Sequence, residues 1–168
     1  MKQYRIIDAD KIHVLSIKTL SGNIECGPDA DASAIASHEF SFGLGTGLNP
    51  EDNIVGLKLV VEIEARDKKD RPLPIKGSYT HEMIFRVDNL EEFIENNGTE
   101  DIIDGLLGST LVSIIYSTVR GIIYSRTQGT SLGVVIIPVI APIKLMELGN
   151  EEQEKQSSNK VKKKRAVK

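Results

Sequence analysis

Apolar and polar residues alternate in three stretches of the first half of the chain. The clearest stretch runs from Leu57 to Arg66, where apolar residues are separated by residues that are mostly charged. The stretch HEFSFGLGT repeats this period at Phe40, Phe42 and Leu44. A third stretch, residues 75–87, places on one face Ile75, Tyr79, His81, Met83, Phe85 and Val87. A period of two is typical of strands with one buried face, and the short polar turns between them predict an antiparallel sheet.

The first 33 residues show a weaker pattern. Two apolar patches, Ile6-Ile7 and Ile12 to Ile17, predict a short helix or turn followed by a strand. Residues 21–33 are rich in Gly, Pro, Asp and Ala, which is typical of a loop. With the three later stretches, this strand completes a four-stranded antiparallel meander.

From Asp101 the apolar residues recur with the period of a helix. The helical stripe consists of Ile103, Leu107, Leu111, Ile114, Ile115, Ile122 and Ile123. We expect Thr99 to cap the start, with Glu100 and Asp101 in the first turn, and Gly129 to end the helix. The opposite side carries small residues that let a second surface approach closely, so we expect a subunit interface there. Its predicted residues are Ser109, Ser113, Ser117 and Gly121, in line with Gly105.

The segment GTSLGVVIIPVIAPIKLM, residues 129–146, is apolar and contains two prolines. An interior proline costs a helix about 3 kcal/mol, so a core helix is excluded. Spanning a membrane needs roughly 20 apolar residues, and the run ends at Lys144. We therefore expect no membrane insertion and a segment buried against protein, followed by a short C-terminal helix. The predicted fold class is α+β, with both helices on one side of the sheet.

Charge divides the chain into two parts. The 168 residues carry a net charge of −3. Residues 151–168 hold seven lysines and arginines against three glutamates, a net charge of +4, which leaves −7 for the rest. We predict a single domain over residues 1–150 and a disordered basic tail over residues 151–168. A negative body argues against a nucleic-acid-binding core. A lone Cys26 and the lack of a signal-peptide pattern predict a cytoplasmic protein.

Motifs that could carry chemistry have structural interpretations that we favour. GLGTG, residues 43–47, departs from the dinucleotide motif at Leu48, so we interpret the glycines as ending a strand and allowing a bend. The pairs His38-Glu39 and His81-Glu82 do not continue to H-E-x-x-H, so we predict no metal site.

No residues form a recognisable catalytic set. Asp101 and Asp104 could act as an acid and base pair, but negative charge is also favourable at a helix start. The chain has no G-x-S-x-G motif, and Cys26 has no recognisable partner. We predict neither an enzyme nor a cofactor. The basic tail could bind RNA, the ribosome or lipid, or could serve only for solubility.

The order of these elements resembles that of the SecB export chaperones. The likeness covers about residues 35–148 and is closest in IIYSTVRGIIYSRTQGTSLGVVIIPV. SecB proteins carry a hydrophobic-aromatic turn and an arginine in the long helix, a glycine after it, and an apolar-proline pair before the last helix. The matching positions here are Ile114, Ile115, Tyr116, Arg120, Gly129, Ile137 and Pro138.

This resemblance implies a homotetramer, a dimer of dimers, that holds unfolded polypeptides or preproteins without nucleotide. An exposed apolar groove beside the sheet would bind the client. The expected groove residues are Phe40, Phe42, Leu44, Val135, Ile137, Ile140, Ile143 and Met146. The SecA translocase motor is a candidate partner, and a role in a toxin–antitoxin system is an alternative. Two rival hypotheses are a small-molecule binder on the same fold and a nucleic-acid-associated adaptor acting through the tail.

Overall fold

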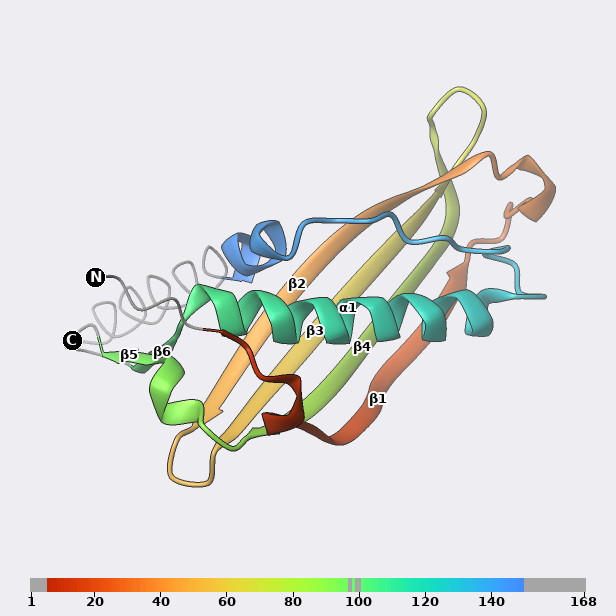
Figure 1. Cartoon of the computed structure of the whole chain (residues 1–168). Helices are drawn as coiled ribbons and strands as arrows, with labels where there is room; N and C mark the ends of the chain where they lie inside the picture. The colour runs from red at the N-terminus through yellow and green to blue at the C-terminus, as the bar shows by residue number, and fades with distance from the viewer. Residues whose placement is uncertain (1–5, 97, 99–100, 150–168) are drawn as a thin grey trace, which may run out of the picture.

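The computed structural model describes residues 6–96, 98 and 101–149, so the predicted basic tail lies outside the described residues. Its main feature is a four-stranded antiparallel sheet (Figure 1). The strands are β1 (Ile12–Cys26), β2 (Ser37–Asn49), β3 (Ile54–Arg66) and β4 (Pro72–Val87). Their order is β1-β4-β3-β2. Only β2, β3 and β4 therefore form the expected meander, because β1 pairs with the last strand in an order of Greek-key type.

The strand β1 is longer than its composition predicts. A turn of 3-10 helix, η1 (Ala9–Lys11), precedes it, as expected for the short helix or turn. The predicted loop over residues 21–33 is wrong in its first part, because Ser21 to Cys26 pair with β4 from Thr80 to Ile75. Pairing with a neighbouring strand outweighs the weak strand propensity of these polar residues. Only after Cys26 does the chain leave the sheet, passing through η2 (Ala32–Ala34).

The alternating faces of β3 and β4 lie as predicted. Every second residue from Val55 to Ala65 on β3 is buried, and so is every second residue from Ile75 to Val87 on β4. The helix α1 (Gly105–Thr127) covers this apolar face of the sheet (Figure 1). Its buried side chains, which complete the core, include Leu107, Leu111, Val112, Ile115, Tyr116, Val119 and Ile123.

The start of α1 differs from the prediction. Asp104 is the N-cap, and its carboxylate accepts a hydrogen bond from the Leu106 N–H at 2.8 Å. Asp101 is not in the first turn, because β6 (Asp101–Ile103) pairs with β5 (Ile94–Asn96), which follows η3 (Leu90–Phe93). The expected cap residues Thr99 and Glu100 lie outside the described residues. The predicted first turn of the helix is therefore not helical at Asp101, because β6 pairs there with β5.

The C-cap of α1 lies one residue before the predicted cap, Gly129. Gln128 is the C-cap, and Gly129 follows with a φ of +75°. This left-handed conformation is favourable for glycine and commonly ends helices. Beyond it, residues 129–141 have no helix or strand, and residues 142–149 are helical.

Candidate functional site

The segment of residues 129–141, which we call the strap, is extended but belongs to no sheet. Its side chains alternate between the core and the surface. Leu132, Val135 and Ile137 are buried. Ile136 is 69% exposed and Val139 is 84% exposed. The strap thus closes the core on one side and presents large aliphatic side chains outward on the other.

The backbone N–H and C=O groups of the strap form hydrogen bonds with side chains of α1 and β2 rather than with a neighbouring strand. Four hydrogen bonds join its backbone to side chains of these elements: from Val135 N to Thr127 Oγ1 (3.1 Å), between His38 Nε2 and Leu132 O (2.9 Å), from Arg120 Nε to Ile137 O (3.0 Å), and from Tyr116 OH to Pro138 O (2.7 Å). A carbonyl can only accept, so the His38 ring carries its proton on Nε2. Buried backbone groups need such partners, which explains how an extended segment without a ladder stays in place.

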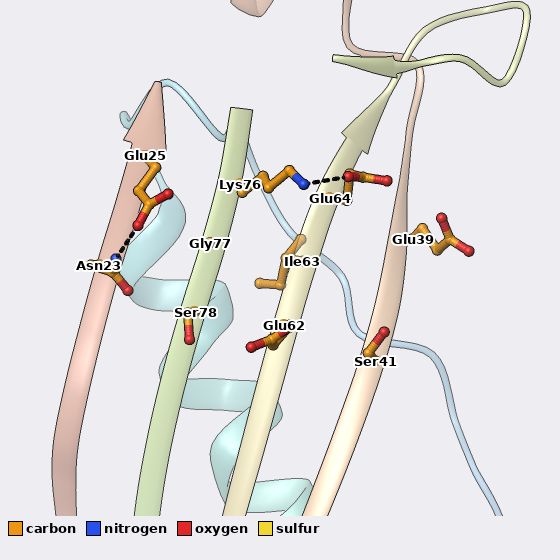
Figure 2. A pocket seen from close by; sticks show the side chains of 10 residues that line it. All are labelled: Asn23, Glu25, Glu39, Ser41, Glu62, Ile63, Glu64, Lys76, Gly77 and Ser78. Carbon is orange, nitrogen blue, oxygen red and sulfur yellow. Dashed lines mark hydrogen bonds and ion pairs between the residues drawn. The ribbon is translucent and has the colours of Figure 1, made fainter. Parts of the chain in front are cut away.

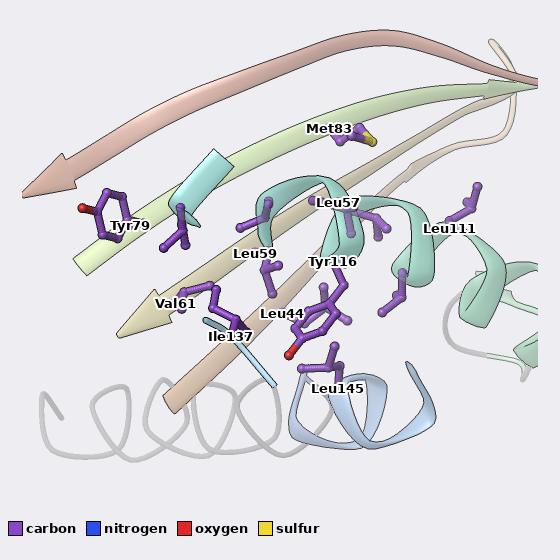
Figure 3. Packing of buried hydrophobic residues seen from close by; sticks show 14 of the residues in the cluster. Leu44, Leu57, Leu59, Val61, Tyr79, Met83, Leu111, Tyr116, Ile137 and Leu145 are labelled. Carbon is purple, nitrogen blue, oxygen red and sulfur yellow. The ribbon is translucent and has the colours of Figure 1, made fainter. Parts of the chain in front are cut away.

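An aromatic row on β2 lies beside this anchoring point. Phe40 and Phe42 stack with ring centroids 6.2 Å apart, and Phe42 meets Tyr116 edge to face at 5.7 Å. Figure 3 shows Tyr116 among Leu44, Ile137 and the C-terminal helix residue Leu145. Burial raises the pKa of Tyr116 to about 12. The hydroxyl therefore stays protonated and continues to donate to the strap at any physiological pH.

The structure divides the eight expected groove residues into three groups. Leu44, Val135 and Ile137 belong to the core and present no surface. Ile143 is exposed, with 52% of its surface accessible. The remaining four are half-buried and pack against the core: Phe40, Phe42, Ile140 and Met146.

Three exposed strap residues were not among those expected: Val134, Ile136 and Val139. They lie in a run in which nearly every residue is apolar, so the sequence pattern does not tell the outward side from the inward side. The strap, the following helix and the aromatic row of β2 together form an apolar surface, which we call the strap surface. Its residues are Phe40, Phe42, Val134, Ile136, Val139, Ile140, Ile143 and Met146.

The small residues of α1 lie on the side of the helix away from the sheet. Ser113, Ser117 and Gly121 are exposed, and Ser109 is half-buried. The serine hydroxyls turn inward: Ser113 Oγ donates to Ser109 O and Ser117 Oγ donates to Ser113 O, each at 2.7 Å. Because these hydroxyls already have acceptors, the row needs no polar partner and can accept a closely packed surface.

The edge strand β1 carries a second exposed apolar group that sequence analysis did not single out. Val14, Leu15, Ile17 and Leu20 are all exposed on this strand. The register with β4 shifts between Val14 and Ser16 and again between Thr19 and Ser21. Bulges at these points re-aim side chains and increase twist. An exposed apolar edge strand is a common site of pairing with another chain.

The motifs considered for chemistry have structural roles. Gly43 to Gly47 lie inside β2, which continues to Asn49, so the interpretation that they end a strand is wrong. Asp104 caps α1, whereas Asp101 accepts a hydrogen bond from Asn96 Nδ2 at 2.8 Å in the β5–β6 hairpin. His81 is buried, whereas His38 binds the strap. Among the described residues, no three His, Cys, Asp or Glu side chains come together as a metal site.

The helix α1 passes a length and composition test for a membrane span, being 23 residues long with a mean hydropathy of 1.5 over its best window. Its apolar side nevertheless packs on the sheet, as the core helix of a soluble protein does. This arrangement fits a soluble protein.

These features together define a SecB-like fold: a four-stranded antiparallel sheet, one long helix across it, and a strap that leads to a short C-terminal helix. A solved structure similar to this chain is the Rv1957 SecB-like chaperone from Mycobacterium tuberculosis, in complex with a ChAD peptide from the Rv1956 HigA1 antitoxin. The TM-score is 0.58 at 10% sequence identity, over 79% of this chain and 92% of that chain. No family model and no curated protein sequence matches. At this identity the likeness establishes the fold, and it confirms the predicted SecB-like architecture.

Proposed function

We propose that the protein is a chaperone that holds unfolded or preprotein polypeptides without nucleotide. The observation that carries this proposal is the strap surface, where aliphatic side chains stand outward on a segment whose backbone is fixed from behind. Contiguous exposed apolar surface on a soluble protein is typical of an interaction site. The negative body described above keeps such a protein soluble while its apolar side chains remain accessible.

The experiment that tests this function is suppression of aggregation. A chemically unfolded client is diluted into buffer with and without the full-length chain, in the absence of nucleotide, and light scattering is followed. We expect scattering to fall as the chain approaches the client in concentration. Scattering that is unchanged at a tenfold excess, for several clients of different charge, would overturn the proposal.

A second candidate is a chaperone dedicated to an antitoxin. The observation that favours it is the solved neighbour, which binds a peptide from an antitoxin on the same fold. The two candidates differ in breadth. A general holdase protects many unrelated clients, whereas a dedicated chaperone protects one partner and is displaced by a short peptide from it. Competition between unrelated clients for the same chain distinguishes them.

We further propose that the chain forms a homo-oligomer, a dimer of dimers. Two separate surfaces support this: the small-residue row of α1 and the apolar edge of β1. A dimer of dimers uses two different contacts on each subunit, and two surfaces of this kind meet that need. We place its site of action in the cytoplasm, with the SecA motor a candidate partner.

The two rival hypotheses have less support. A small-molecule binder needs a concave, mostly apolar pocket with a few convergent polar groups. The hollow that the structure describes is open and lined mainly by polar residues. An adaptor for nucleic acid would act through residues 151–168. It is distinguished by whether client binding survives deletion of that segment.

A further inference from the structure

The face of the sheet opposite α1 carries a concentration of carboxylates at one end. The strand register places Glu25, Lys76, Glu64 and Glu39 in one row across all four strands. The adjacent row contains Asn23, Ser78, Glu62 and Ser41. Figure 2 shows these side chains on the side of the sheet away from the helix. They line an open hollow of about 470 Å³.

Two of the four carboxylates already have cationic partners. Glu64 pairs with Lys76 at 2.8 Å, and Arg66 pairs with both Glu64 and Glu39. Within the part of the chain that the structure describes, neither Glu25 nor Glu62 takes part in an ion pair; Glu25 only accepts a hydrogen bond from Asn23. The carboxylates outnumber the cations, and the hollow keeps a net negative charge that a cationic ligand would balance.

The described chain ends beside the edge strand β2, on the side of the sheet that α1 covers. Gly149 packs against Leu44 of β2, which is an edge strand of the sheet. The row that contains Ser41 is three residues along the strand from Leu44. At about 3.3 Å per residue this is a distance of about 10 Å.

The remaining sequence has the length and charge to reach and fill the hollow. Ten residues, 150–159, separate Gly149 from the basic cluster, and fully extended they span up to about 33 Å. The cluster KVKKKRAVK, residues 160–168, holds six cations and no carboxylate side chain. A segment on such a short tether has an effective concentration in the millimolar range, so even weak ion pairs populate the docked state.

We propose that the basic segment 160–168 of this chain docks on its own acidic hollow, passing around the open edge of β2, with Glu25 and Glu62 as its principal acceptors. The contact is electrostatic and reversible. It covers the end of the exposed sheet face where Glu25 and Glu62 form no ion pair with another described residue. A cationic partner of this face must displace the tail first.

Disulfide trapping in the full-length chain tests this contact. In a Cys26→Ser background, Val167→Cys is combined with Ser41→Cys in the hollow. The control combines Val167→Cys with Thr46→Cys. Thr46 is exposed on the same strand and only two residues from Leu44, but the register places it on the face shared with α1. An undocked tail would reach both positions at similar rates.

We expect the bond at position 41 to form about fivefold faster or more at low salt, and the difference to disappear when the Debye length shortens to about 3 Å at 1 M salt. Glu62→Gln and Glu25→Gln should each reduce the rate at position 41, whereas Glu91→Gln, in η3, should not. Equal rates at positions 41 and 46 at low salt would overturn the proposal. Crosslinks between chains, seen as a dimer on a non-reducing gel, would also overturn it by assigning the tail to a neighbouring copy.

Discussion

His81 is a polar side chain buried in the core. It is fully buried, and neither ring nitrogen has a hydrogen-bond partner among the described residues. Its ring stacks on Tyr79 at 6.5 Å, and Arg126 contributes positive charge nearby. Burial, and then the charge of Arg126, lower the pKa of His81. The folded protein therefore holds this ring neutral.

A pH dependence of stability follows. An unfolded histidine binds a proton near pH 6.5, whereas folded His81 does so only at lower pH. The free energy of unfolding should therefore fall as the pH drops below about 6.5, by at most about 1.4 kcal/mol per pH unit for one group, until the lowered folded pKa is reached. His81→Leu should flatten this slope in urea unfolding series at pH 7.5 and 5.5. Equal slopes in the variant and the wild type would contradict the assignment.

Tyr116 and Arg120 act as anchors of the strap rather than as binding residues. Tyr116→Phe removes the donor to Pro138 O and should lower the free energy of unfolding by about 1 kcal/mol, because one part-buried carbonyl loses its partner. Hydrogen exchange or limited proteolysis should show faster opening of the strap. Tyr124→Phe is the matched control, since Tyr124 is exposed on the same helix. Equal effects of the two changes would show that the hydroxyl of Tyr116 does not hold the strap.

Among the elements, the strap offers a direct comparison between neighbouring residues. Ile136 is 69% exposed and Ile137 only 2%. Ile136→Asp, and likewise Val139→Asp, should weaken client holding severalfold in the scattering assay while circular dichroism and thermal unfolding stay near wild type. Ile137→Asp should instead destabilise the fold by several kcal/mol, because a buried unpaired charge is costly.

The result that would contradict this prediction is specific. If Ile136→Asp and Val139→Asp protect clients as well as the wild type and remain folded, the strap surface does not bind clients. Ile143→Asp, on the helix after the strap, extends the test to the end of the same surface.

The elements also show what sequence can predict and what it cannot. The strands β3 and β4 were predictable because an apolar residue recurs at every second position of the buried face, and the body of α1 because its apolar residues recur with the helical period. The end of β1 was not, because Ser21 to Cys26 are held in the sheet by β4 and not by their own propensity. The orientation of the strap was hidden for a different reason. Apolar residues occupy nearly every position, and hydrogen bonds from side chains distant in sequence, such as Tyr116 and Arg120, fix which side faces inward.

For the whole molecule, the two uncovered surfaces have different chemistry. The α1 row consists of small side chains, and its serine hydroxyls donate hydrogen bonds to carbonyls of the same helix. The β1 edge is apolar and, within the described sheet, has no strand on its outer side, so its backbone can pair with another strand. One intersubunit contact through the α1 row and another through the β1 edge would bury both surfaces. A subunit with two distinct contacts assembles in two steps. The proposed dimer of dimers therefore predicts that the contacts can be broken separately.

Native mass spectrometry of charge variants checks this prediction. Ser117→Arg places a bulky cation in the α1 row, and Ile17→Lys places one on the β1 edge. Each should reduce a tetramer to a dimer, because desolvating an unpaired charge at a packed contact costs several kcal/mol, and the double variant should be a monomer. Glu51→Lys, in the turn between β2 and β3, changes charge away from both surfaces and should leave the mass unchanged. A wild-type chain that is monomeric at micromolar concentration would rule out the tetramer. It would leave the strap surface to be judged by its own variants, since no part of that surface needs a second subunit to be formed.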